Sequence, residues 1–244
     1  MRIQIITLNL WNTEYWENRT NAVEAFLATY QADIYCFQEI REETLVFLDA
    51  RLPDYTRIEG SEPGWRSENT IYVRKTSFNV EAFGRVDLAM PETDRGLFWA
   101  KLRTKKGIPL FVGTMHLTHQ LNADECASGM SHRHRQAHRA AKALDSLVGT
   151  EAAVICGDFN DPVHPSRILK SEAGFEDVFT ILKVPAPVTF PCPYLSDETD
   201  LVESIDKIMI KGKIRPLLAS SPRFSIPNSV LSDHWPVAAV LELE

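Results

Sequence analysis

Short apolar runs rich in β-branched residues recur along the chain and alternate with segments of helical periodicity. Strands are expected at residues 3–9, 33–38, 69–74, 78–88, 97–103, 108–116, 152–157, 204–210 and 236–242. Helices are expected at residues 18–29, 43–52 and 132–148, the second of them stopped by Pro53. Helices separate some strands, whereas other strands follow one another directly. This order is typical of an α/β or α+β architecture built on sheet layers.

The length of 244 residues fits one large domain or two small ones. The chain contains no internal repeat and no Gly/Ser linker. The proline-rich stretch from Pro185 to Pro193 resembles a linker, but only about fifty residues follow it, too few for a comfortable second core. We therefore expect a single domain over residues 1–244, with this stretch as an internal loop.

Composition and charge limit the partners of the protein. Hydrophobic residues make up 44% and charged residues 24%, as in an ordinary soluble protein. The net charge of −7 argues against non-specific coating of nucleic acid, so any contact with DNA or RNA needs a local basic patch. No apolar stretch approaches the ~20 residues of a membrane span, and the first strand begins at once, without a signal-peptide pattern. The four cysteines stand far apart without a CxxC motif, which favours a reducing compartment. A cytoplasmic monomer without membrane insertion is expected.

Polar and titratable side chains gather where the expected strands end. They are Asn9, Gln38, Glu39, His116, Asp158, Asn160, Asp206, Asp233 and His234. Each of them alone is more often a turn or capping residue. Their joint occurrence at strand ends favours a functional site, because sheets of this class place functional groups there on a rigid frame. Carboxylates, amides and imidazoles together suit a hard cation and a phosphate.

The motifs around these residues resemble those of the endonuclease/exonuclease/phosphatase superfamily. In chain order they are TLNLWN (7–12), QEIR (38–41), GTMHLTH (113–119), GDFND (157–161), SIDKIMI (204–210) and SDHWPV (232–237). The segment from Arg133 to Gln136 also resembles the family's RxxQ. The fold that this resemblance implies is α/β, a four-layer α/β sandwich of two packed β-sheets with helices outside and the site at one sheet edge.

The resemblance implies a metal centre. Glu39 resembles the main Mg²⁺ ligand, and Asn9 and Asp233 resemble residues that complete or water-bridge the metal shell. Arg41 matches a position that contacts substrate in some members. Mg²⁺ keeps several waters, so one or two protein carboxylates suffice, and Mn²⁺ is a possible substitute. The ion would neutralise charge that develops on the phosphate.

The resemblance also implies roles in the attack of water on phosphorus. Asp158 resembles the group that orients and deprotonates the attacking water. Asn160 resembles the amide that holds this water or a phosphate oxygen. His234, held in one tautomer by Asp206, resembles the phosphate-binding imidazole. His116 resembles a second phosphate-contacting imidazole, for which Glu68 is a candidate orienting carboxylate.

These features predict a metal-dependent hydrolase of phosphate esters that acts by in-line water attack. A phosphodiesterase acting on DNA or RNA is favoured, because Arg41, Arg133 and Arg135 would offer several phosphate contacts. One alternative is a phosphatase or phosphodiesterase of small phosphorylated metabolites or lipid headgroups. A second is a non-catalytic binding module on the same scaffold, which the intact set of site residues disfavours. The combination of His116 with QEIR in place of QETK disfavours an abasic-site endonuclease, and the lack of a membrane-binding hairpin disfavours a sphingomyelinase.

Two further features have competing interpretations. His132, His134 and His138 include an i, i+4 pair that could bind Zn²⁺. No third kind of ligand is evident nearby in the sequence, so a solvated basic helix face is favoured. Trp11 could stack on substrate or simply pack against the fold.

Overall fold

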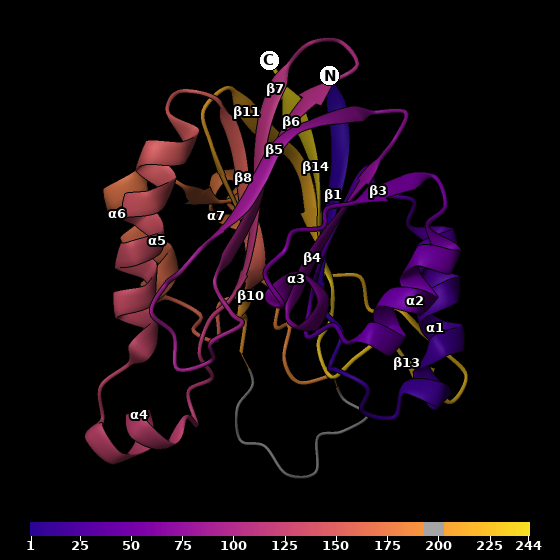
Figure 1. The fold of residues 1–244 in the computed structure, drawn as a ribbon, viewed down its shortest axis with the longest axis horizontal. Helices are drawn as coiled ribbons and strands as arrows, with labels where there is room; N and C mark the ends of the chain where they lie inside the picture. Colours follow the sequence, from indigo (N-terminus) through magenta and orange to yellow (C-terminus); the bar gives the residue numbers. More distant parts are fainter. Residues whose placement is uncertain (193–202) are drawn as a thin grey trace.

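The computed structural model describes residues 1–192 and 203–244, which build two six-stranded mixed sheets packed face to face (Figure 1). The first sheet has the order β11 (Ile214–Ser220), β14 (Val237–Leu243), β1 (Arg2–Asn9), β2 (Ile34–Gln38), β4 (Asn69–Arg74), β3 (Tyr55–Arg57). The second has the order β5 (Phe78–Val86), β6 (Leu97–Thr104), β7 (Pro109–His116), β8 (Ala152–Asp158), β10 (Asp206–Lys211), β9 (Glu176–Asp177). A small hairpin joins β12 (Ser225–Ile226) to β13 (Ser229–Val230).

Helices of different lengths accompany the two sheets, and the longer ones cover the outer faces. Those of the first half are α1 (Trp16–Thr29), α2 (Glu42–Arg51) and α3 (Gly64–Ser67). The others are α4 (Ala123–Ser128), α5 (His132–Val148), α6 (His164–Ala173) and α7 (Val178–Leu182). Figure 1 shows α1 and α2 on one side of the pair of sheets, and α5 and α6 on the other. The predicted four-layer α/β sandwich is confirmed.

The central strands are buried on both faces, which explains their continuous apolar runs. In β1, Ile3 and Ile5 face the core between the sheets, whereas Ile6 and Leu8 pack with the residues of α1 and α2. In β8, Val154 faces that same inner core, and its neighbours face α5 and α6. The alternation of a strand places successive side chains on opposite faces, so each apolar run serves two cores.

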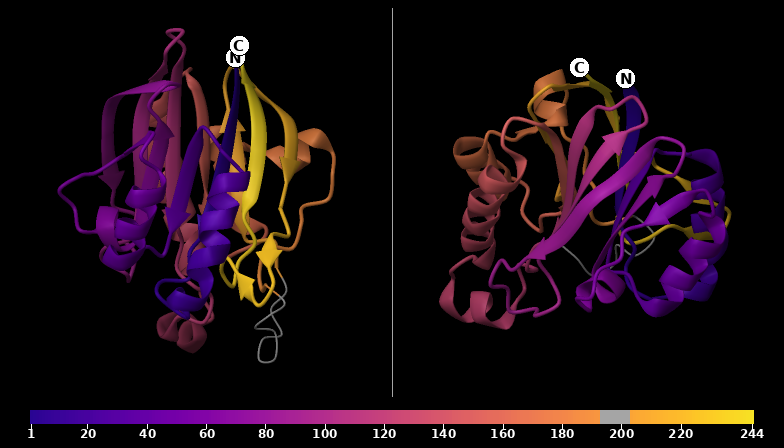
Figure 2. Two further views of the ribbon diagram at one scale, coloured as in Figure 1. Left: turned by 90° about the vertical axis from the view of Figure 1, so that its right-hand side faces the viewer. Right: turned by 45° about the horizontal axis from the view of Figure 1, so that its top comes forward.

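Strand register brings the ends of distant segments together. β1 and β2 are parallel and end with Asn9 opposite Gln38. β7 and β8 are also parallel and end with His116 opposite Asp158, and β10 begins with Asp206 opposite that same Asp158. The polar residues predicted at strand ends therefore lie at one edge of the sandwich. The two termini lie side by side at the opposite edge (Figure 2), where Arg2 pairs with Glu242.

Several short elements escaped prediction, and for β11 and α6 the sequence shows why. β11 carries Pro216 and a bulge between Pro216 and Leu218, features that weaken a strand pattern and suit an edge strand. α6 is only ten residues long, although Pro165 in its first turn and Gly174 at its C-cap mark both ends. The end of the Pro185–Pro193 stretch lies outside the described residues. Within the described part of the chain, no helix is long and apolar enough to cross a membrane.

Candidate active site

Local backbone geometry aims the polar side chains at the edge of the sandwich. Glu39 follows β2 with φ of 52°, and Asn160 follows β8 with φ of 49°, both in the left-handed region that non-glycine residues seldom adopt. Gly157 is required for a different reason, since a Cβ there would lie 2.0 Å from the carbonyl oxygen of Met115. Such strained positions cluster at functional sites, where the surrounding structure holds them.

Asn9 joins the carboxylates of the two sheets. Its Nδ2 lies 3.2 Å from Glu39 Oε1 and 3.1 Å from Asp158 Oδ2, while its Oδ1 accepts a 2.8 Å hydrogen bond from the Trp11 amide. Asn12 Nδ2 donates to the other oxygen of Glu39. The amide nitrogen of Asn9, and not its oxygen, therefore faces the predicted metal ligand.

His234 is bound to a carboxylate on one nitrogen and faces two others with the second. Its Nδ1 lies 2.9 Å from Asp206 Oδ2, and its Nε2 lies 3.8 Å from Asp158 and 4.0 Å from Asp233. Burial lowers the pKa of the imidazole, but the charges of Asp206, Asp233 and Asp158 together raise that pKa well above its usual value. The predicted pairing of His234 with Asp206 is present, and it favours an imidazolium.

His116 has the opposite electrostatic environment. Its Nε2 lies 3.5 Å from Asp158 Oδ2 and 3.1 Å from Arg95 Nη1. Burial, and then the charge of Arg95, lower the pKa of His116 well below its usual value, which favours a neutral ring. Glu68 does not contact His116 directly but binds Arg95 at 2.9 Å, so this candidate partner acts through the arginine.

Buried carboxylates crowd the site. Burial is the main cause that raises the pKa of Asp158 to about 7 and also raises the pKa of Glu39 and of Asp233. The neighbouring charge of Asp233 adds to the effect on Glu39. The raised pKa values mean that nearby positive charge does not offset the cost of burying these carboxylates. Carboxylate oxygens are also the ligands that hard divalent cations prefer. The residues present thus fit the metal ion that the motifs imply.

A second grouping overlaps with the first. The donor atoms of Asp158, Asp206 and His234 lie within 4.8 Å of one another. We interpret this trio as a hydrogen-bonded relay and not as the metal centre, because His234 Nδ1 is already engaged by Asp206.

The predicted substrate-binding residues differ in availability. Asn160 is buried and its Nδ2 donates to the carbonyl of Leu117 at 2.9 Å. Arg41 donates to the carbonyls of Ile40 and Ser67, with its side chain 39% exposed. Arg133 was expected to flank the site, but it is buried and bound to Glu125 and to the carbonyl of Thr118.

Arg95 was missed by the sequence analysis. It lies in the turn before β6, outside every motif, and only its approach to His116 and to the carbonyl of Leu117 places it at the site. Asn12 belongs to the TLNLWN motif but received no role. Gln38 was noted as part of a strand end, and its side chain bonds Thr114 across the two sheets at 2.9 Å.

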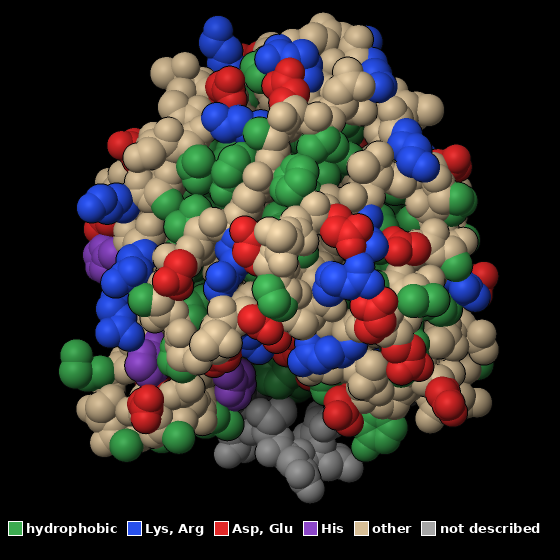
Figure 3. Space-filling model, in the orientation of Figure 1, with side chains coloured by type: hydrophobic (Ala, Val, Ile, Leu, Met, Phe, Trp, Pro, Cys, Tyr) green, Lys and Arg blue, Asp and Glu red, His purple; other side chains and the backbone are tan. Residues whose placement is uncertain are grey.

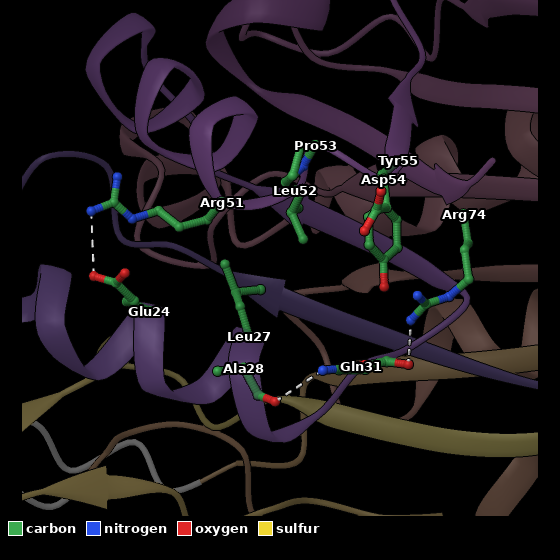
Figure 4. A pocket seen from close by; sticks show the side chains of 10 residues that line it. All are labelled: Glu24, Leu27, Ala28, Gln31, Arg51, Leu52, Pro53, Asp54, Tyr55 and Arg74. Atoms are coloured by element: carbon green, nitrogen blue, oxygen red, sulfur yellow. Dashed lines mark hydrogen bonds and ion pairs between the residues drawn. The ribbon is translucent and has the colours of Figure 1, made fainter. Parts of the chain in front are cut away.

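One pocket lies far from the polar cluster, and another lies close to it. A pocket of about 240 Å³ opens at the other end of β2 and β4, where Arg51 pairs with Glu24 and Arg74 donates to the Gln31 carbonyl (Figure 4). Its two arginines are engaged by the Glu24 carboxylate and by a backbone carbonyl, so neither is free to bind an anion there. A groove of about 330 Å³ beside the β1–α1 loop is lined by Trp11, Tyr15 and the turn before β13.

The fold and the polar cluster together define a hydrolase of phosphate esters. The family model described as "Endonuclease/Exonuclease/phosphatase family" matches residues 6–234, and the chain belongs to this family. No curated protein of known function shows a significant sequence match.

Several solved structures share the fold at low sequence identity. A D. rerio TDP2 complexed with single-strand DNA product has 20% identity and a TM-score of 0.82, with 99% of each chain covered. A mannosyl-6-phosphatase from Bacteroides thetaiotaomicron has 18% identity and a TM-score of 0.81, with 99% of this chain and 100% of that chain covered. The human Nocturnin catalytic domain with bound sulfate has 17% identity and a TM-score of 0.75, covering 100% and 95%.

Proposed function

We propose that this protein is a Mg²⁺-dependent phosphodiesterase that acts on nucleic acid by in-line attack of water, with Mn²⁺ as a substitute ion. The observation that carries the proposal is the convergence of two differently charged imidazoles, His116 and His234, on one buried carboxylate, Asp158. An anionic substrate needs cationic and hydrogen-bonding groups on several sides of the phosphorus, and a base on the side of the attacking water.

Glu39 and Asp233 are the proposed metal ligands, and Asn9 orients Glu39 through its amide nitrogen. When bound, the divalent ion supplies charge neutralisation at the phosphate. The side chains of Glu39 and Asp233 are 17% and 19% exposed, which leaves room for the waters that Mg²⁺ retains.

Asp158 is the proposed general base. A pKa of about 7 suits proton transfer at neutral pH, since the carboxylate is partly available and still basic enough to accept a proton from water. His234 donates from Nε2 to a phosphate oxygen while Asp206 holds Nδ1. Asn160 keeps the loop after β8 in place and presents its remaining polar atoms to water or phosphate.

His116 and Arg95 are proposed to bind a second phosphate oxygen together. The guanidinium supplies positive charge that the neutral imidazole lacks, and Glu68 fixes the guanidinium at 2.9 Å. Arg41, which is 3.8 Å from Glu68, adds a further contact for an adjoining phosphate. Arg95 and Arg41, and not the buried Arg133, would contact a substrate with several phosphates.

The aromatic pair beside the site favours a nucleic acid over a simple ester. Trp11 and Tyr15 have ring centroids 5.3 Å apart, and Tyr15 is 63% exposed. Both rings follow the Asn9 position on the β1–α1 loop, and base stacking on exposed rings contributes about 1–3 kcal/mol per base. The DNA-product complex of the related TDP2 supports the same choice.

The alternative is a phosphatase or phosphodiesterase of a small phosphorylated metabolite or lipid headgroup. It is favoured by the net charge of −7, by the burial of Arg133 and by the relative described as a mannosyl-6-phosphatase. We also propose one domain over residues 1–244, since the strands of both sheets share one core, and a monomer that works in the cytoplasm.

A substrate panel tests the proposal. Single-stranded DNA, RNA, duplex DNA, a chromogenic diester, a sugar monophosphate and sphingomyelin would be assayed with Mg²⁺ and with Mn²⁺. We expect the highest kcat/KM on a single-stranded nucleic acid and a steep loss of affinity with salt. Faster turnover of the monophosphate or the lipid, with nucleic acid no better than the chromogenic diester, would select the alternative.

A further inference from the structure

A group of two histidines and one carboxylate lies outside the proposed catalytic site. His134 comes from the first turn of α5, Asp161 from the loop after β8, and His164 from the start of α6. Their donor atoms all lie within 4.8 Å of one another. The sequence showed His134 only as one of several histidines on α5, and the fold adds the carboxylate and the third ligand that were missing.

Asp161 is held in place by backbone hydrogen bonds. Its Oδ1 accepts two 2.8 Å hydrogen bonds, from the backbone amides of Val163 and His164. The other oxygen, Oδ2, lies 3.2 Å from His164 Nδ1 and 3.9 Å from Arg133 Nε. A carboxylate with one oxygen fixed by backbone donors presents the second in a defined direction, which is how supporting hydrogen bonds orient metal ligands.

The two imidazoles lie beside each other, and the His164 ring also contacts this oxygen. The ring centroids of His134 and His164 are 4.8 Å apart, and the side chain of His164 is 57% exposed. The ligands of a tetrahedral ion with bonds of 2.0–2.1 Å are about 3.3 Å apart, so small side-chain rotations suffice for coordination. His134 also lines a groove of about 670 Å³ along α5 that opens to solvent.

The Asp161 carboxylate supplies the negative charge of the group, and basic side chains of α5 line the groove beside it. Arg133 is the nearest positive side chain, and its charge is matched by the buried ion pair with Glu125. Figure 3 shows Lys, Arg and His side chains along the edge of the molecule formed by α5 in Figure 1. Two imidazoles with one carboxylate favour Zn²⁺, Co²⁺ or Ni²⁺ over Mg²⁺, which prefers oxygen ligands.

We propose that His134, Asp161 and His164 form a second metal site, for a transition-metal ion such as Zn²⁺, that is distinct from the Mg²⁺ centre at Glu39. Three protein ligands leave a position for water. The ion would tie α5 and the first turn of α6 to the loop that carries Asp158 and Asn160. Its role is therefore structural support of the catalytic loop.

Calorimetric titration of Zn²⁺ into the protein saturated with Mg²⁺ tests the site. We expect one equivalent of Zn²⁺ to bind. His134→Ala and His164→Ala should each weaken binding at least ~10-fold, since even the loss of a residue that only supports a metal ligand typically costs about that much. His138→Ala is the matched control, because His138 lies one turn along α5 and pairs with Glu172 instead. Glu39→Gln should leave Zn²⁺ binding unchanged.

Two further readouts do not depend on activity. Co²⁺ in place of Zn²⁺ should give visible absorption bands of a four- or five-coordinate ion, and these should disappear in His164→Ala. Zn²⁺ should raise the Tm of the wild type but not of His134→Ala, because a ligand stabilises only the state that binds it. The proposal would be overturned if Zn²⁺ did not bind stoichiometrically. It would also be overturned if His138→Ala lost as much Zn²⁺ affinity as the ligand variants, or if Glu39→Gln lost Zn²⁺ affinity.

Discussion

The two sheets bring different carboxylates to the same edge. On the first-sheet side, the side chains of Glu39 and Asp233 are 17% and 19% exposed. On the second-sheet side, those of Asp158 and Asp206 are 2% and 1% exposed. The partly exposed carboxylates leave room for an ion that keeps its waters. The fully buried carboxylates lie around His234, with Asp206 bonded to its Nδ1 and Asp158 3.8 Å from its Nε2, an arrangement that suits proton transfer. We propose that this difference in exposure separates the carboxylates that hold the metal ion from those that serve proton transfer.

The largest effect should come from removing the buried base. Asp158→Asn keeps the shape and the hydrogen bond from the Asn160 amide but cannot accept the proton. We expect kcat to fall by ~10²–10⁴-fold, as when a general base is lost. Single-turnover kinetics on the best substrate would measure this. The matched control is Asp145→Asn on the exposed face of α5, which should behave as wild type. A Asp158→Asn enzyme within a few-fold of wild type would place the base elsewhere.

A variant of the partly exposed Glu39 should respond to the Mg²⁺ concentration, whereas a variant of the buried Asp158 should not. EDTA should abolish activity, and Mg²⁺ or Mn²⁺ should restore it. Glu39→Gln should lower activity by about 10²-fold at fixed Mg²⁺ and recover in part as Mg²⁺ is raised, because a metal ligand has been weakened. Asp158→Asn should show no such recovery. Equal behaviour of the two variants in a Mg²⁺ titration would remove the distinction between the two sides.

The pair of His234 and Asp206 should control the alkaline limit of activity. The raised pKa of His234 keeps its cationic form at neutral pH, and that form is lost as pH rises through this pKa. Asp206→Asn removes the nearest charge that raises the pKa, so the alkaline limb of kcat against pH should move to lower pH. At neutral pH we expect kcat of Asp206→Asn to fall about 10-fold. An alkaline limb that stays in place would show that His234 does not act as a cation.

Local patterns were sufficient for an architecture built on sheet layers and for the polar residues at strand ends, whereas the four-layer sandwich was expected from the resemblance of the motifs. β4 and α5 have the predicted bounds, since apolar alternation and helical spacing are strong there. The residues of the motifs meet because the parallel pairs β1–β2 and β7–β8 end at the edge where the antiparallel strands β10 and β14 begin. Arg95 and the inward turn of Arg133 were not predictable, because both depend on contacts between distant segments: Arg95 with His116, and Arg133 with Glu125. The contrast in burial between the two sides also needs the packed sheets.

The smallest expected effect on chemistry concerns the contact that holds the sheets in register beneath the site. Gln38 is buried, and its Nε2 donates to Thr7 on β1 and to Thr114 on β7, at 3.0 and 2.9 Å. Gln38→Leu leaves both hydroxyls without this partner, and an unmet buried polar group costs about 1–3 kcal/mol. The free energy of unfolding should fall by that amount in urea titrations. Because Glu39 is adjacent in sequence, activity should fall only a few-fold, through misplacement of the ligand relative to Asp158.

Thr114→Val is the control, since it removes one hydroxyl and should cost less stability than Gln38→Leu. Unchanged stability in Gln38→Leu would mean that the apolar core alone aligns the two sides.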